Sequence, residues 1–300
     1  MFKVAWHSLY CHPLPLQHRF PMEKYNLLPQ QLQHEGIIHA NQLINPSKVN
    51  DDIILWTHAP EYLNKLNQLS LSSSEIRSTG FPLSETLIER EKVIAQGTID
   101  AALYALKDGI GFNCAGGTHH AFTNKGEGFC LLNDMAIAAN YLLKMSLVEQ
   151  ILVVDLDVHQ GNGTAQIFAN QPKVFTFSMH GKKNYPLRKE QSDLDIELED
   201  FTNDDNYLSL LEEHLNKLVA SIKPNFIFYQ AGVDVLAEDK LGRLSLTIEG
   251  CKARDKIVLA ICKKNHIPLA VTMGGGYSPN INTIITAHTN TFRLANDIFC

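Results

Sequence analysis

The stretch ILVVDLDVHQGNGT, residues 151–164, decides the fold, because four apolar residues run directly into Asp155, Asp157 and His159. A short run of branched apolar residues predicts a strand that is buried on both faces, as in a parallel sheet. Strands of this kind present functional side chains at their carboxyl ends. The stretch therefore predicts an α/β fold with a polar site at one edge of the sheet.

The same stretch offers two candidate metal ligands. Residues two apart on an extended chain point to the same side, so the Asp157 carboxylate and the His159 imidazole can meet at one ion, and Asp155 shares their face. A mixed oxygen and nitrogen pair suits zinc or another first-row divalent metal. The alternative interpretation is a strand that merely ends in a polar turn, and a third ligand has to come from elsewhere.

Other apolar runs alternate with helical patterns along the chain. Strands are predicted at residues 4–6, 151–154, 174–178, 226–229 and 268–272, and helices at residues 84–107, 131–144, 206–222 and 248–265. Ser84 is the expected N-cap of the first of these helices. This alternation favours a predominantly parallel sheet with helices on both faces.

The chain has 300 residues, 45% of them hydrophobic, which is enough for a sizeable core. No linker, repeat or long charged block divides it, and we interpret the polar residues 71–80 as a surface loop. We therefore expect one domain over residues 1–300. The net charge of −6 and the scattered basic residues argue against direct nucleic-acid binding.

Cysteine usage and the N-terminus bear on localisation. The 6 cysteines are dispersed without a CxxC pair, which is typical of reduced thiols. The N-terminal segment lacks the uninterrupted apolar core of a secretion signal, and no later run is long enough for membrane insertion. We expect a soluble cytoplasmic protein.

Adjacent histidines stand out in FNCAGGTHHAF, residues 112–122. His119 and His120 follow a glycine pair, and histidine titrates nearest to neutral pH, so the two can serve as a general base and an acid or electrostatic partner. Two hydrogen-bonded turn histidines are the alternative. In the next motif, GEGFCLLND, Gly128 and Phe129 can form one wall of a narrow pocket or simply a turn before a helix.

Two further motifs follow predicted strands. Asp234, in FYQAGVDVLAEDKLGRLSLT (228–247), is the candidate third metal ligand, although aspartate in a loop often only forms a turn. In LAVTMGGGYSP (269–279), three glycines free the backbone to bring the Tyr277 hydroxyl to a substrate oxygen on which negative charge develops. A phosphate loop is disfavoured, because the segment lacks the Lys-Ser/Thr ending.

Taken in order, His119-His120, GFCLLND, DLDVHQGNGT, AGVD and GGGY resemble the zinc-dependent histone deacetylase family. HPLPLQHRFPMEKY, residues 12–25, resembles the opening segment of its bacterial members, which include acetoin-utilisation and polyamine deacetylase proteins. The resemblance implies the arginase/deacetylase fold, a single deacetylase-like catalytic domain over residues 1–300, and a hydrolase of acyl-lysine amides.

The resemblance also implies the cofactors. Asp157, His159 and Asp234 match the ligands of one catalytic Zn²⁺, with coordination positions left for water and the substrate carbonyl. Tyr277 matches the phenol that polarises that carbonyl. A structural K⁺ site is implied at Asp155, Asp157, His159, Ser178 and Met179.

The histidine pair acquires roles in the same way. His120 matches the general base, and His119, backed by Asp155, matches the electrostatic partner or proton donor. Asn162 stands where class I and II members carry a second aspartate behind the second histidine. This makes the DLDVHQGNG motif more similar to that of class IV members. Class IV resemblance implies that removal of long fatty-acyl groups from lysine is an open alternative to deacetylation.

Substrate-binding residues are implied as well. Gly128 and Phe129 match the tunnel wall that holds the lysine stem, and Tyr185 is the candidate for the opposing wall. Arg19 resembles the arginine that holds glycine carbonyls near Tyr277, in the segment that contains Gly275. The loop at residues 78–84 lacks the aspartate with which many relatives hold the substrate backbone.

Three readings of function remain open. The first is deacylation of acyl-lysine in proteins or peptides, and the second is deacetylation of a small amine such as an acetylpolyamine. The third, from another class, is a metal-dependent binding protein without turnover. A manganese-dependent arginase-like hydrolase would need more bridging aspartates than this chain supplies.

Overall fold

The computed structural model describes residues 2–16 and 18–300. One eight-stranded sheet has the order β2-β1-β3-β8-β7-β4-β5-β6, and every pair of neighbours runs parallel. The strands are β1 Lys3–Ala5, β2 Leu43–Ile44, β3 Ile110–Asn113, β4 Ile151–Asp155, β5 Val174–Gly181, β6 Leu194–Leu198, β7 Phe226–Gln230 and β8 Leu269–Thr272. The predicted α/β fold with a parallel sheet is confirmed.

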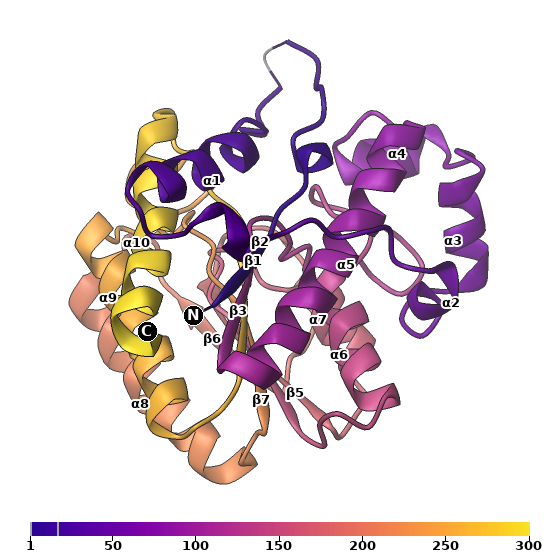
Figure 1. Cartoon of the computed structure of the whole chain (residues 1–300). Coiled ribbons are helices and arrows are strands. Elements are labelled where there is room, and N and C mark those ends of the chain that lie inside the picture. The colour runs from indigo at the N-terminus through magenta and orange to yellow at the C-terminus, as the bar shows by residue number, and fades with distance from the viewer. Residues whose placement is uncertain (1, 17) are drawn as a thin grey trace.

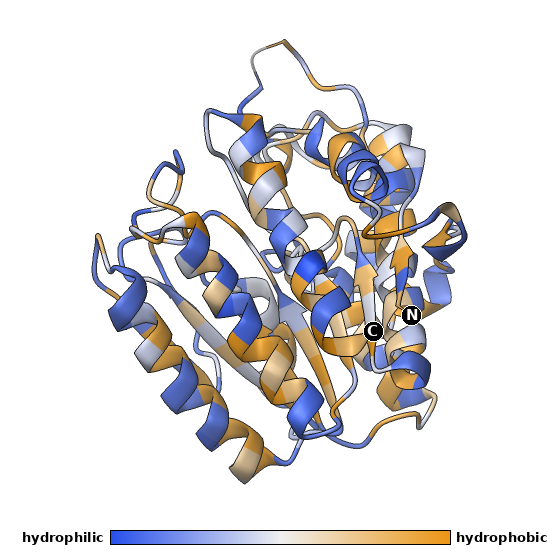
Figure 2. Cartoon of the chain, turned by 60° about the vertical axis from the view of Figure 1, so that its left-hand side comes forward, coloured by the Kyte–Doolittle hydropathy of each residue, from blue (hydrophilic) through white to orange (hydrophobic). Residues whose placement is uncertain are grey.

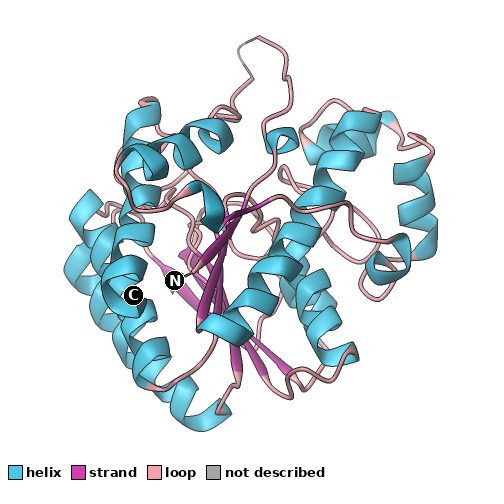
Figure 3. Cartoon of the chain, viewed as in Figure 1, coloured by secondary structure: helices cyan, strands magenta, loops and turns pink. Residues whose placement is uncertain are grey.

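Helices cover both faces of this sheet (Figures 1 and 3). The α-helices are α1 Lys24–His34, α2 Asp51–Ile54, α3 Pro60–Asn67, α4 Ser73–Thr79, α5 Glu85–Asp108, α6 Asp134–Lys144, α7 Asn162–Phe168, α8 Asp204–Ile222, α9 Ile248–Lys264 and α10 Ile281–Phe299, with short 3-10 helices at Ser8–Tyr10 and Ala40–Gln42. Helices α8, α9 and α10 form one layer, with α1 packed on α10, and α5, α6 and α7 form the other. Helices α2 to α4 lie beyond α5 and α6.

Burial explains why the central strands read as continuous apolar runs. Every residue of β3, β4, β7 and β8 is buried, because helices cover both faces of these strands. The edge strands β2 and β6 are mostly half-buried. Figure 2 shows largely hydrophobic strands, while the outer helices alternate hydrophobic and hydrophilic residues.

Helix ends follow local capping. The predicted cap is present: the Ser84 hydroxyl accepts from the Leu87 backbone N–H at 3.1 Å, and Gly109 ends α5 with φ of 88°. The helix predicted from residue 131 starts later, because Asn133 caps α6 through the Ala136 N–H.

The prediction of a surface loop at residues 71–80 is wrong, because this segment contains α4. Ser72 and Glu75 form a capping box, in which the Ser72 hydroxyl accepts from the Glu75 N–H at 3.3 Å and the Glu75 carboxylate accepts from the Ser72 N–H at 2.7 Å. Gly80, with φ of 75°, ends the helix. The serine-rich composition concealed a standard helix-start signal.

Several elements were not predicted. Strand β3 contains Gly111, which weakens a strand signal but is needed here, since a Cβ would overlap the Ala101 carbonyl of α5. Helix α10 is rich in Thr and Ile, whose branched side chains lower helix propensity. Helix α1 contains Pro29. Among the described residues, no helix combines the length and apolarity needed to cross a membrane.

Candidate functional site

Four neighbouring strands of the sheet, β3, β8, β7 and β4, end at one edge. His119 and His120 follow β3, Tyr277 follows β8, Asp234 follows β7, and Asp157 and His159 follow β4. Parallel strands bring these loops together at their carboxyl ends. The sheet order therefore collects motifs that are up to 158 positions apart, from His119 to Tyr277, at a single site.

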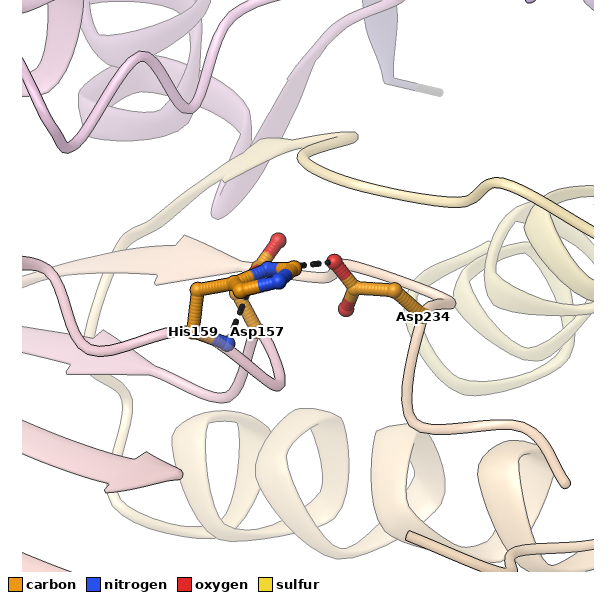
Figure 4. Close-up of side chains that lie close together, drawn as sticks. All are labelled: Asp157, His159 and Asp234. Carbon is orange, nitrogen blue, oxygen red and sulfur yellow. Dashed lines mark hydrogen bonds and ion pairs between the residues drawn. The ribbon is translucent and has the colours of Figure 1, made fainter. Parts of the chain in front are cut away.

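Asp157, His159 and Asp234 form a compact cluster (Figure 4). His159 Nδ1 lies 3.0 Å from Asp157 Oδ1 and 3.1 Å from Asp234 Oδ2. All three residues are buried, with 1%, 7% and 0% of their surfaces exposed. These separations are close to the ~3.3 Å edge of a tetrahedron of ligands about 2.0 Å from zinc.

The charge balance of the cluster fits a bound cation. Burial and the neighbouring Asp157 carboxylate raise the pKa of Asp234 to about 7. Burial opposes protonation of His159, but both carboxylates outweigh it and raise the pKa of His159 to about 10. Two buried carboxylates thus require positive charge between them, which a divalent metal supplies without a proton.

Backbone amides orient the two carboxylates. Asp234 Oδ1 accepts from the Val158 N–H at 2.9 Å, and Asp157 Oδ2 accepts from the Gly275 N–H at 2.8 Å. Each aspartate is left with its other oxygen facing His159. Outer contacts of this kind fix ligand geometry.

Gly275 supports the cluster at close range. A Cβ built on Gly275 would overlap carboxylate oxygens of both Asp234 and Asp157. Only glycine lets the backbone come near enough to donate to Asp157. The structure thus places Gly275 against the candidate metal ligands.

The two histidines have different partners. His119 Nδ1 lies 2.6 Å from Asp155 Oδ2, whereas His120 Nδ1 lies 2.7 Å from Asn162 Oδ1, and the ring centroids are 4.1 Å apart. Burial disfavours the charged form of His119, but Asp155 and Asp157 outweigh it and raise its pKa. Burial and then the neighbouring His119 lower the pKa of His120 well below its ordinary value. The pair therefore has one more basic and one less basic member.

Asp134, which sequence reasoning missed, holds the histidine loop in place. Its carboxylate accepts from the backbone N–H of Thr118 at 2.7 Å and of Gly117 at 3.1 Å, and from the Thr98 hydroxyl at 2.5 Å. Gly116 and Gly117 have φ of 80° and 76°, which glycine adopts readily. Asp134 starts α6 directly after its cap Asn133, inside the segment that the sequence predicted as a helix from residue 131, so nothing local marked its contact with the histidine loop.

A pocket of about 460 Å³ opens onto these residues. Its lining includes His120, His159, Tyr277, Phe129 and Gly128. The Tyr277 backbone is held by the Asp239 carboxylate, which accepts from its N–H at 2.6 Å.

The pocket has aromatic walls. The Phe129 ring lies 6.0 Å from the Tyr277 ring, and the Tyr185 ring lies 5.0 Å from the His120 ring. The backbone N–H groups of Gly128 and Phe129 donate to carbonyls of α4, at Ser78 and Thr79. Helix α4 therefore positions one wall of the pocket.

Arg19 lies elsewhere than predicted. Its guanidinium lies over the Phe129 ring, 4.9 Å from the centroid, and the residue lines the pocket mouth. A glycine carbonyl near Tyr277 is instead held by Lys24, whose Nζ donates to Gly274 O at 2.8 Å. The packing of α1 therefore brings Lys24, the first residue of this helix, to the carbonyl contact that the resemblance implied for Arg19.

The residues implied in a potassium site are neighbours. Asp155 pairs with Ser178 in the register of β4 and β5, and Met179 follows Ser178. Both Ser178 and Met179 are buried, and Gly181 at the end of the same strand donates its N–H to the Val158 carbonyl, between Asp157 and His159, at 2.9 Å.

The fold and the cluster define an α/β protein with a candidate metal centre and a histidine pair at the carboxyl edge of a parallel sheet. The Histone deacetylase domain family matches residues 18–292. An uncharacterized protein of Picosynechococcus sp. is 42% identical over 298 residues, covering 99% of each chain. A probable deacetylase of Archaeoglobus fulgidus is 30% identical, over 92% of this chain and 81% of that protein.

A solved structure agrees in fold. The crystal structure of an HDAC homolog complexed with SAHA covers 98% of this chain and 84% of its own, with a TM-score of 0.83 and 23% identity. The chain belongs to the histone deacetylase family, and is a deacetylase-family hydrolase with the arginase/deacetylase fold.

Proposed function

We propose that this protein is a zinc-dependent lysine deacylase that hydrolyses the amide bond of Nε-acyl-lysine. One observation carries the proposal: a candidate metal ligand, one histidine of the pair and Tyr277 line a single aromatic-walled pocket of about 460 Å³, and the other two candidate ligands and the second histidine adjoin them. A lysine side chain is long and apolar along its stem, so Phe129 and Tyr185 suit it as walls.

Each side chain has a defined task in this reaction. Zinc held by Asp157, His159 and Asp234 would supply Lewis acidity and a lowered pKa for water. His120, the less basic histidine, accepts the proton of the attacking water. Tyr277 donates a hydrogen bond to the oxygen that becomes negative.

The leaving amine needs a second proton as its bond to the acyl carbon breaks. His119, the more basic histidine, supplies it to the lysine amine while Asp155 stabilises the charged ring. The products are a free amine and a carboxylate. We propose K⁺ at Asp155, Asp157, His159, Ser178 and Met179 as a structural ion only.

A short acyl group fits the inner end of the site. Behind the metal cluster lies a cavity of about 40 Å³, lined in part by Phe20, Tyr25 and Ile94. This is less than a tenth of the volume of the outer pocket. The cavity supports acetyl as the substrate group, and removal of a long fatty-acyl chain would require its walls to move.

The pocket mouth favours acyl-lysine over an acetylpolyamine. Four cationic side chains line it, those of Arg19, Arg77, Lys183 and Arg243. Among the described residues that line the pocket, none has an acidic side chain. Asp200 partly offsets two of these charges, at 3.5 Å from Lys183 and 3.2 Å from Arg243. A polycationic amine would be repelled, whereas a peptide with acidic neighbours of the lysine would be attracted.

The test is turnover on matched lysine peptides bearing acetyl, trifluoroacetyl, octanoyl or myristoyl groups, beside acetylated polyamines, with zinc content measured on the same preparation. We expect acetyl-lysine turnover that is faster with acidic than with basic flanking residues, and a difference that shrinks as salt rises. Faster turnover of the polyamines would establish the second reading. Zinc-loaded protein that turns over no amide would establish a metal-dependent binding protein.

A further inference from the structure

The contacts behind His120 do not end at Asn162. Asn162 Nδ2 donates to Glu127 Oε1 at 2.6 Å, while Asn162 Oδ1 faces His120 Nδ1 at 2.7 Å. The other carboxylate oxygen of Glu127 lies 3.0 Å from Lys125 Nζ. A continuous chain thus runs from an exposed lysine through a carboxylate and an amide to a buried histidine.

The chemistry of these groups fixes the direction of the chain. A carboxylate has no hydrogen to donate, so the Asn162 amide must turn its NH₂ group toward Glu127. Its oxygen then faces His120, and a contact at this distance requires Nδ1 of the ring to carry the hydrogen. In the neutral ring the lone pair is therefore on Nε2, which is the nitrogen left for chemistry in the pocket that His120 lines.

We infer that Glu127 is a positioning residue: through Asn162 it holds His120 in the tautomer with hydrogen on Nδ1 and a basic Nε2. This inference rests on the proposed function, in which His120 is the general base. An asparagine alone could present either its oxygen or its NH₂ group to the ring, and the second orientation would place hydrogen on Nε2. Glu127 removes this ambiguity and places a negative charge two side chains from the histidine.

The burial of the chain strengthens its effect. Asn162 and His120 are 2% and 4% exposed, and the Glu127 side chain is 12% exposed. Hydrogen bonds in such surroundings are less weakened by water than those on the surface. Glu127 is not among the described residues that line the pocket, and it reaches His120 through Asn162. Burial and then Glu127 also raise the pKa of Tyr185 in the pocket wall, so the tautomer of His120 has to be read directly as well.

Exchanging the carboxylate at position 127 and the amide at position 162 tests the inference, first one position at a time. In Glu127→Gln, two amides face each other and the orientation of neither is fixed, so kcat should fall by about 10-fold or more. The loss should be smaller than the 10²- to 10⁴-fold that a general base itself contributes. KM should stay near its wild-type value. In Asn162→Asp, two carboxylates face each other, and kcat should fall as well.

The double variant Glu127→Gln/Asn162→Asp restores a hydrogen-bond chain in which every donor faces an acceptor. The carboxylate introduced at position 162 would accept from His120 Nδ1–H and from the amide introduced at position 127, so kcat should exceed that of both single variants. Glu213→Gln, an exposed change on α8, is the matched control and should leave kcat unchanged. Wild-type kcat in Glu127→Gln, or a double variant no better than the poorer single variant, would overturn the inference.

A spectroscopic measurement reads the tautomer without turnover. In protein labelled with ¹⁵N-histidine, the nitrogen signals of His120 should show hydrogen on Nδ1 in the wild type, with and without zinc, and a mixture of tautomers in Glu127→Gln. Hydrogen on Nε2 in the wild type would refute the role of Glu127. Absence of amide turnover by a wild type with the expected tautomer would refute the proposed function instead.

Discussion

At the scale of single residues, three aspartates of similar sequence context have different surroundings. Asp157 and Asp234 each turn one oxygen to His159, while Asp155 turns to His119. All three are buried, so each needs a positive or hydrogen-bonding partner. The partner, rather than the residue type, distinguishes the two candidate zinc-binding carboxylates from the one that supports a histidine.

Replacing Tyr277 with phenylalanine tests the oxyanion role at this scale. The ring would still pack against Phe20 and Phe129, so zinc content and thermal stability should remain close to the wild type. Loss of one hydrogen-bond donor to the developing negative charge should lower kcat by roughly 10²-fold or more. Steady-state kinetics and zinc analysis of the variant check this, and unchanged turnover would remove Tyr277 from the mechanism.

Gly275→Ala tests the close approach of backbone and metal ligands. The added Cβ would collide with the carboxylates of Asp157 and Asp234, so zinc affinity should fall by about 10- to 100-fold, as for other outer contacts of metal sites. Competition with a chelator measures the affinity. Gly36→Ala is a useful control, since nothing lies within 4 Å of its Cβ position, although φ of 69° will cost some stability. Equal zinc affinity in wild type and Gly275→Ala would contradict the steric argument.

At the scale of elements, the short helix α4 lies between a partly exposed charged residue at its start, Glu75, and the pocket wall at its end. Its residues Ser78 and Thr79 accept from the backbone of Gly128 and Phe129. Its start depends on the capping box of Ser72 and Glu75. Helix capping and pocket shape are therefore coupled.

Removal of the Glu75 charge should reveal a pH dependence. Hydrogen bonds from Lys65 and Ser72 lower the pKa of Glu75 from 4.5 to about 2. The folded state thus favours ionised Glu75, and this stabilisation is present above pH 4.5 and is lost as pH falls toward about 2. Glu75→Gln should therefore lower the free energy of unfolding near neutral pH.

The size of this effect is limited by exposure, since the side chains of Glu75 and Lys65 are 31% and 48% exposed. A loss of about 0.2–1 kcal/mol is expected for an exposed pair. Urea unfolding at pH 7 and pH 4 measures it, and the difference between wild type and variant should be smaller at pH 4. A difference that grows on acidification would contradict the assignment.

At the scale of the whole molecule, the candidate metal ligands follow two neighbouring strands of the sheet. Asp157 and His159 follow β4 and Asp234 follows β7, its neighbour. A ligand that binds only the folded state stabilises it by about 2.7 kcal/mol at 100 times its Kd. Zinc should therefore raise the Tm of the metal-free protein by about 5 °C.

Asp234→Asn provides the control for this zinc effect. The change removes a buried carboxylate whose ionisation is disfavoured by burial and by Asp157, so the metal-free variant should be at least as stable as the metal-free wild type. It should also lose the zinc-induced rise in Tm. Differential scanning fluorimetry with and without zinc decides, and an equal rise in both proteins would place the zinc elsewhere.

The sequence alone determined the parallel α/β class, five of the strands that carry the site or flank it, and the motifs that meet there. These features are local, since buried strands, capped helices and glycine turns leave patterns within a few residues. Short or glycine-containing elements such as β3, and the Thr-rich α10, left weaker patterns and were not predicted.

Only the tertiary structure decided which side chains act together. Lys24 meets Gly274 across 250 positions, and Glu127 meets Asn162 across 35, with no pattern near either residue to announce the contact. Such pairs depend on how helices and loops pack over the ends of the sheet, which is a property of the whole chain. The stretch at 151–164 therefore identified two candidate metal ligands and Asn162, whereas packing alone brought Glu127 to the amide behind His120.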